Sequence, residues 1–273
     1  MVSSICKLID EDIAGTEFFT GKAAAWTEKG FLEAVKILIK EKNTLFESLI
    51  GKLNDYPELN SIIQTILFAG RSIPYNTDTQ AIDIAAMFGF IKEQNGNVVI
   101  ANKIFEARLY NLYLSTEETR NAPIFKTASR NKNQFIQDGR LDMDLVIDKY
   151  VEYFKEIYGE HYERFDESEG RRRFLMFIKP IINGTGNFDI EPQTRDESRM
   201  DVVIDYNGER FIVEMKLWRR RAYNEKGEKQ LIDYLSYYNL KKGYLLSYNF
   251  NKNKEIGVHR VQIGKSILVE AVI

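Results

Sequence analysis

The sequence predicts a mixed α/β protein, with a helical N-terminal part and a C-terminal core built from a helix, three strands, a helix and a strand. Two observations support this class. Up to about residue 115, apolar residues recur mainly at helical spacing, whereas after residue 140 helical segments alternate with short runs that have the two-residue period of strands. A chain of 273 residues, 44% of them hydrophobic, can form two compact domains. We therefore predict a helical domain at 1–115, a linker at 116–140 and an α/β domain at 141–273.

The N-terminal part is expected to form helices and one hairpin. The predicted helices are 29–42, 43–56, 57–70, 78–89 and 102–114. Asn43 is a suitable cap for the second helix, and Pro57 suits the first position of the third. The hairpin, at 90–101, is centred on Asn95-Gly96, a pair that favours a tight turn. Three helices followed by a hairpin are the parts of a winged-helix module, which serves DNA binding and protein docking alike.

The segment 116–140 is polar, has weak periodicity and contains Pro123, which favours a linker. Beyond it, the sequence predicts an α/β core with the sheet covered by helices. The predicted helices are 141–159, 168–182 and 225–242, and the predicted strands are 188–193, a hairpin at 199–218, 243–250 and a final hairpin at 256–273.

Composition and charge exclude several classes of protein. The single cysteine, Cys6, excludes an intrachain disulfide and a cysteine-based zinc site, and a cytoplasmic location is the simplest expectation. No stretch approaches the roughly 20 apolar residues that a membrane span needs. A net charge of −2 gives no general attraction to nucleic acid, so phosphate contacts would have to come from the arginine runs at 170–174 and 218–222. The candidates within these runs are Arg172, Arg173 and Arg219. Such runs are equally typical of solvated surfaces.

The predicted C-terminal hairpin places two acids side by side. Asn207-Gly208 favours a two-residue type I′ turn, which pairs Tyr206 with Glu209 and fixes the register of the strands. Counting outward from the turn, Asp201 falls directly opposite Glu214, with Cβ atoms about 4.5–5.5 Å apart. Like charges in this position destabilise a sheet unless another group neutralises them.

Lys216 lies on the same face as the two acids, because side chains alternate along a strand. Two arrangements would neutralise the acids. In the first, Asp201 and Glu214 bind Mg²⁺ or Mn²⁺, for which carboxylates are suitable ligands, and Lys216 orients a water molecule or stabilises negative charge. In the second, Arg199 lies opposite Lys216, and the four side chains form a neutral ion quartet. The geometry alone does not decide between these arrangements.

The spacing of these residues resembles a known nuclease signature. Asp201, followed thirteen positions later by Glu214-Met215-Lys216, is similar to the D…ExK motif of the PD-(D/E)XK nuclease superfamily. "GERFIVEMKLW" and "SRMDVVIDYNG" resemble the nuclease domain at the C-terminus of a family of AAA-type ATPases. The resemblance covers about 165–250 and implies a restriction-endonuclease-like αβββαβ core. It also implies hydrolysis of DNA with Mg²⁺ or Mn²⁺.

The resemblance implies further site residues. An acid on the first core helix often completes the metal site of this family; Glu169 matches it in position, and Glu167 is the competing candidate. Gln230 resembles the glutamine of the family's Q-x-x-x-Y element, with Tyr234 four residues later. Arg199 resembles the basic residue just before the family's aspartate. The implied catalytic set is Asp201, Glu214, Lys216, Glu169 and Gln230, and the implied metal ligands are Asp201, Glu214 and Glu169.

The N-terminal half resembles the winged-helix region that follows the ATPase core in some of these proteins, notably in "SIPYN" and "GNVVIANKIFEARLYN". The Walker motifs themselves are missing from this sequence. We therefore expect either the C-terminal part of a longer ATPase or a relic that has lost its motor, and we favour the first.

The expected function is metal-dependent cleavage of DNA, with DNA rather than RNA inferred by analogy. Two alternatives stay open. One is a catalytically silent module that binds nucleic acid. The other is a regulatory, protein-interaction domain of an ATPase, in which the acids form the structural quartet. The sequence leaves the oligomeric state open, a homodimer included.

Overall fold

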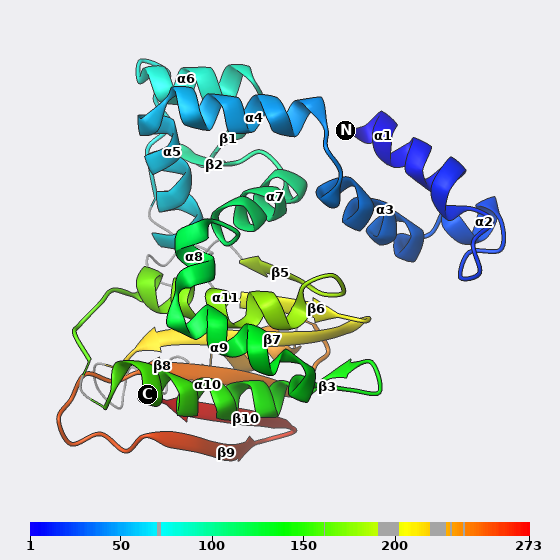
Figure 1. The fold of residues 1–273 in the computed structure, drawn as a ribbon. Helices are drawn as coiled ribbons and strands as arrows, with labels where there is room; N and C mark the ends of the chain where they lie inside the picture. Colours follow the sequence, from blue (N-terminus) through cyan, green and yellow to red (C-terminus); the bar gives the residue numbers. More distant parts are fainter. Residues whose placement is uncertain (70–71, 161, 191–201, 219–227, 230, 237) are drawn as a thin grey trace. The chain divides into compact units, whose positions relative to one another are not determined.

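The structure, a computed structural model, describes the chain except for residues 70–71, 161, 191–201, 219–227, 230 and 237. The chain folds into two compact units (Figure 1). The first comprises Met1–Ile63 and Ile73–Leu109, and the second comprises Gln64–Ser72 and Tyr110–Ile273. Among the described residues, no helix has both the length and the apolar character needed to cross a membrane.

The helices predicted for the N-terminal part are confirmed. They are α3 (Glu28–Lys40), α4 (Thr44–Asp55), α5 (Pro57–Gln64), α6 (Gln80–Met87) and α7 (Lys103–Tyr113). They are preceded by α1 (Val2–Lys7), the π-helix η1 (Leu8–Ile13) and α2 (Lys22–Ala25), and α5 continues into the π-helix η2 (Thr65–Ala69). The side chain of Asn43 accepts a hydrogen bond from the Leu45 amide at 2.9 Å and so caps α4.

The predicted hairpin between α6 and α7 is also confirmed. Strands β1 (Ile91–Gln94) and β2 (Asn97–Ile100) pair antiparallel around Asn95 and Gly96. Both turn residues have positive φ, 53° and 77°, as a type I′ turn requires. The element order expected for a winged-helix module is therefore present, while its use in DNA binding or protein docking stays a prediction.

The second unit is built on one mixed sheet. Its strands are β5 (Asn187–Ile190), β6 (Val202–Tyr206), β7 (Glu209–Leu217), β8 (Lys242–Tyr248), β9 (Gly257–Ile263) and β10 (Ser266–Val272). Their order in the sheet is β5-β6-β7-β8-β10-β9, in which β8 pairs parallel with both β7 and β10, and the other pairs are antiparallel. Helix α11 (Glu167–Ile182) precedes β5, and residues 228–229 and 231–236 are helical between β7 and β8. The predicted order of helix, three strands, helix and strand is therefore confirmed.

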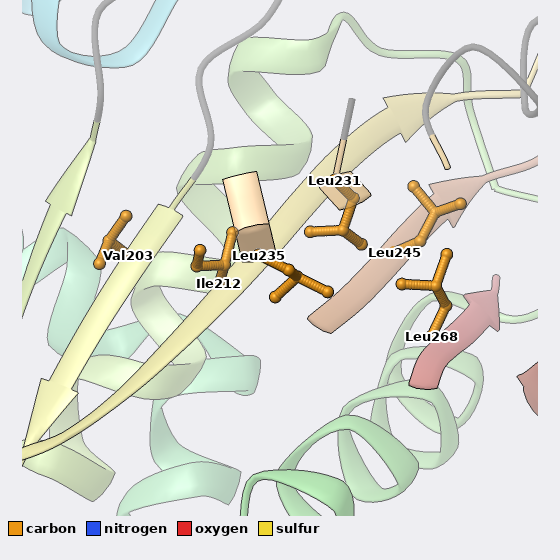
Figure 2. Close-up of a cluster of buried hydrophobic side chains, with 6 residues drawn as sticks. All are labelled: Val203, Ile212, Leu231, Leu235, Leu245 and Leu268. Carbon is orange, nitrogen blue, oxygen red and sulfur yellow. The ribbon is translucent and has the colours of Figure 1, made fainter. Parts of the chain in front are cut away.

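Apolar side chains cover both faces of this sheet. On one face, Leu231 and Leu235 from the helical segment pack on strand residues (Figure 2). The strand residues of this cluster are Val203, Ile212, Leu245 and Leu268. The opposite face is covered by α10 (Met143–Tyr158) and α11, which lie together over the strands in Figure 1. The central strands are consequently shielded from solvent on both sides.

A close contact fixes α11 on its face of the sheet. The Tyr248 hydroxyl lies 2.8 Å from that of Tyr150 and donates a hydrogen bond to the Gly170 carbonyl at 2.7 Å. A Cβ atom at Gly170 would lie 2.6 Å from the Tyr248 ring. Glycine is therefore required here because the helix backbone rests directly on an aromatic ring.

The segment 116–140, predicted as a linker, is instead regular structure in the second unit. It forms α8 (Glu117–Asn121), α9 (Pro123–Asn131), the 3-10 helix η3 (Lys132–Phe135) and a small hairpin of β3 (Ile136–Gln137) and β4 (Arg140–Leu141). Ile124, Ala128 and Phe135 are buried, and α9 packs against α11. Ile124 and Ala128 lie one turn apart on the buried side of α9, and the polar residues around them conceal this pattern in the sequence. The domain boundaries at 115 and 141 stay a prediction.

Replacing Gly170 by alanine tests the contact between α11 and the sheet. We expect Gly170→Ala to lower the free energy of unfolding by about 1–3 kcal/mol, because the added methyl group overpacks against Tyr248. The measurement is thermal or urea unfolding followed by far-ultraviolet circular dichroism. The matched control is Gly51→Ala in α4, where nothing lies within 4 Å of the added Cβ; it should leave stability unchanged or raise it by about 0.5–1 kcal/mol. Equal stability of the two variants would contradict the contact.

Candidate functional site

A buried ion pair lies in the middle of β7. The side chains of Glu214 and Lys216 both have 0% exposure, and Lys216 Nζ lies 3.6 Å from Glu214 Oε1. The two residues are two positions apart in a strand, so they project from the same face, as predicted. Ile212, one step earlier on this face, belongs to the apolar cluster of Figure 2. The charges therefore stand at the border of a hydrophobic core.

Such a pair is expensive to bury. Removing a carboxylate and an ammonium from water costs several kcal/mol per ion, and their attraction offsets this only when other groups assist. A second cation, Arg171 of α11, lies near enough to Glu214 to interact with it electrostatically. Burial lowers the pKa of the Arg171 guanidinium, and the nearby Tyr110, Glu167 and Glu214 act in the opposite direction.

Arg171 is itself held inside the second unit. It is 3% exposed, and its Nη1 donates a hydrogen bond to the carbonyl oxygen of Phe68 in η2. The arginine run at 170–174 is thus not one solvated surface. Its first arginine, Arg171, belongs to the core of the second unit.

The register that brings the predicted acids together is confirmed over the described residues. Val202 pairs with Val213 and Tyr206 with Glu209, around a turn whose residues 207 and 208 have φ of 48° and 81°. This is the register that the sequence predicts from its Asn-Gly turn. Asp201 directly precedes the first of these pairs, and it lies outside the described residues. Three other predicted site residues also lie outside them: Arg199, Arg219 and Gln230.

The two candidate acids of α11 differ in their partners. Glu169 accepts a hydrogen bond from Arg173 Nε at 2.7 Å, one turn further along the helix. Glu167 lies one turn before Arg171 and acts on the same guanidinium as Glu214 does. Glu167 and Glu214 thus both act on the Arg171 guanidinium, whereas Glu169 is paired with Arg173. The role of Glu169 as a metal ligand stays a prediction.

Arg172 and Arg173, two of the arginines predicted to contact phosphate, differ in how far their side chains are exposed. Arg173 is 19% exposed and stacks on the rings of Tyr158 and Phe165, with its Cζ atom 4.4 and 4.6 Å from their centroids. Arg172 is 37% exposed, and its Nη2 lies 3.9 Å from Glu118 Oε1. Of these two arginines, Arg172 is the one whose side chain can better reach a ligand.

One polar residue on this face escaped sequence reasoning. Ser247 of β8 is 1% exposed, and the strand register pairs it with Lys216. A serine within the apolar run "YLLSY" is the signal that could have indicated it.

Carboxylate oxygens are the ligands that Mg²⁺ and Mn²⁺ prefer, so Glu214 suits such a cation. In the part of the chain that the structure describes, no group of three or more His, Cys, Asp or Glu side chains is arranged to hold a metal ion. The predicted ligand set includes Asp201, which is not in that part.

The comparison with protein families agrees with this arrangement. Residues 189–261 match the family model of the PD-(D/E)XK nuclease superfamily. This segment is a PD-(D/E)XK superfamily domain, and it contains both Glu214 and Lys216. The resemblance to the superfamily is thereby confirmed for this part of the chain. Searches of the curated proteins and of the solved structures gave no match.

Breaking the buried ion pair should destabilise the second unit. Lys216→Met leaves the Glu214 carboxylate buried without its ammonium, so we expect a loss of about 3–5 kcal/mol in the free energy of unfolding. The double variant Glu214→Gln, Lys216→Met should lose less than the sum of the two single variants. Urea unfolding can be followed by the fluorescence of Trp218, next to β7, in a Trp26→Phe background that removes the other tryptophan.

The matched control for this prediction is the ion pair of Asp205 and Arg210, on the same hairpin. Its atoms are 2.7 Å apart, but both side chains are about 40% exposed. Asp205→Asn should therefore cost less than about 1 kcal/mol, since water already solvates both groups. Strictly additive effects at Glu214 and Lys216 would show that the buried pair does not act as a unit.

Proposed function

We propose that the second unit hydrolyses phosphodiester bonds of DNA in the presence of Mg²⁺ or Mn²⁺. The observation that carries this proposal is the buried pair of Glu214 and Lys216, set on one strand of a PD-(D/E)XK superfamily domain. Apolar residues of similar size are often as stable as a buried ion pair, so the presence of charges here favours a functional role.

Glu214 and Asp201 would hold the cation, with Glu169 or Glu167 as a further ligand. One feature supports this assignment for Glu214: its carboxylate oxygens are hard donors, of the kind that Mg²⁺ and Mn²⁺ prefer. The assignment of Asp201 rests on the predicted register, which the described pairs of β6 and β7 follow up to Val202. When bound, such a cation supplies a reactive hydroxide and offsets charge on the phosphate.

Lys216 would act on the charge that develops during the reaction. Its ammonium is fixed beside Glu214 in a site without solvent exposure, where electrostatic interactions are stronger than in water. In this position it stabilises the negative charge of the transition state or orients the attacking water. Gln230 is proposed to assist at the same site, and Arg172, Arg199 and Arg219 to contact the phosphate backbone.

The second candidate is a catalytically silent module that binds nucleic acid. The same ion pair favours it, because Lys216 and Arg171 both interact with Glu214 and could balance its charge without a metal ion. A regulatory domain of an ATPase would fit this cluster as well. The association with an AAA-type ATPase stays a prediction, since the family match covers only residues 189–261.

A plasmid-nicking assay with Mn²⁺ separates these functions. Wild type should cut, and Lys216→Ala and Asp201→Asn should each reduce the rate about 100-fold or more, the usual effect of removing one charged group from such a site. Asp205→Asn, on the same hairpin, should cut like wild type. Binding of DNA without cutting would instead identify the silent module, and the absence of both activities would favour the regulatory domain.

Metal binding can also be detected without DNA. Since a ligand of the folded state stabilises it, millimolar Mg²⁺ should raise the unfolding temperature of wild type, and removal with EDTA should reverse the change. Glu214→Gln should lose most of this shift, whereas Asp205→Asn should retain it. An equal shift in all three proteins would place the bound cation elsewhere.

A further inference from the structure

Ser247 carries a buried hydroxyl that the proposed reaction does not yet use. Its side chain projects from β8 and is 1% exposed, and the oxygen makes no hydrogen bond within the described structure. The oxygen also has essentially no accessible surface. A buried hydroxyl without a partner destabilises a protein relative to alanine at the same position. The position therefore requires an explanation other than stability.

The strand register places this hydroxyl beside Lys216. In the parallel pairing of β7 and β8, Lys216 lies opposite Ser247, and Glu214 lies opposite Leu245. Leu245 belongs to the cluster under the helical segment, so all four side chains project from that face of the sheet. Lys216 thus has a carboxylate on its own strand and a hydroxyl on the next.

The ammonium of Lys216 and a metal ion would compete for Glu214. Lys216 Nζ is 3.6 Å from Glu214 Oε1, within the space where a cation bound to this carboxylate would repel it. A lysine side chain has four methylene groups and can turn, but inside the unit its ammonium still needs an acceptor. The hydroxyl oxygen of Ser247 can accept such a hydrogen bond.

We propose that Ser247 is the alternative acceptor for Lys216. When a divalent cation engages Glu214, the Lys216 ammonium turns from that carboxylate and donates a hydrogen bond to Ser247 Oγ. Ser247 is then a positioning residue, which acts through Lys216 and lets the ammonium and the cation occupy the site together. This inference rests on the proposed function, because it assumes that Glu214 binds a metal ion.

A double-mutant cycle of Mn²⁺ affinities tests the proposal. The affinity for Mn²⁺ is measured by isothermal titration calorimetry for wild type, Ser247→Ala, Lys216→Met and the double variant. Ser247→Ala should weaken binding about ten-fold, the size of one hydrogen bond to a charged group. Lys216→Met should bind Mn²⁺ more tightly than wild type, and in that background Ser247→Ala should have no effect. Lys216→Gln serves the same purpose if Lys216→Met does not fold.

The matched control is Thr119→Val, at another hydroxyl in the same unit. Thr119 is also 1% exposed, but its Oγ1 donates to the Tyr113 carbonyl at 3.1 Å. This variant should lower stability and leave the affinity for Mn²⁺ unchanged, whereas Ser247→Ala should weaken the affinity without a loss of stability. The contrast separates a structural hydroxyl from a positioning one.

The outcomes distinguish this proposal from the function on which it rests. Equal effects of Ser247→Ala with and without Lys216 would overturn the role of Ser247 and leave the nuclease proposal standing. Coupled binding without cleavage of DNA by wild type would overturn the nuclease proposal and leave the role of Ser247 standing. Failure of wild type to bind Mn²⁺ would overturn both.

Discussion

The structure of the second unit depends on how it stabilises buried charges within a sheet whose two faces are both covered. Glu214 and Lys216 lie on a central strand, with the apolar cluster around Leu231 and Leu235 on their own face and two helices on the other. Neither side chain is exposed to solvent in this structure, so protein groups must stabilise both charges. The strand spacing supplies the first partner, because residues two apart share a face, and α11 supplies a second cation through Arg171.

This constraint links elements that are distant in the chain. Arg171 can remain charged in the interior because the Phe68 carbonyl accepts a hydrogen bond from it and the acids nearby oppose the effect of burial. Gly170, the neighbouring residue, lets α11 approach Tyr248 closely enough to hold the helix in place. Apolar packing thus places α11 on the sheet, and electrostatic interactions allow the charged Arg171 to lie in the interior.

Local sequence predicted the parts of this arrangement that local chemistry controls. The Asn207-Gly208 turn requires positive φ at both positions, and it alone determined the register of β6 and β7. The parallel pairing of β7 with β8 joins residues about 30 positions apart, and no turn specifies it, so the place of Ser247 beside Lys216 could not be predicted. Three adjacent arginines likewise do not reveal which one faces the core, and the buried side of α9, with Ile124 and Ala128, lies within a polar segment.

The path of the chain has a consequence for how such a unit can be inherited. The backbone passes between the two units three times, because Gln64–Ser72 belongs to the second unit although residues on both sides of it belong to the first. The acceptor of Arg171 therefore comes from a stretch about 100 residues upstream of the helix that needs it. A gene fusion or rearrangement with its junction between residues 73 and 109 would transfer the arginine without its carbonyl partner. The second unit is therefore complete only when residues 64–72 accompany residues 110–273.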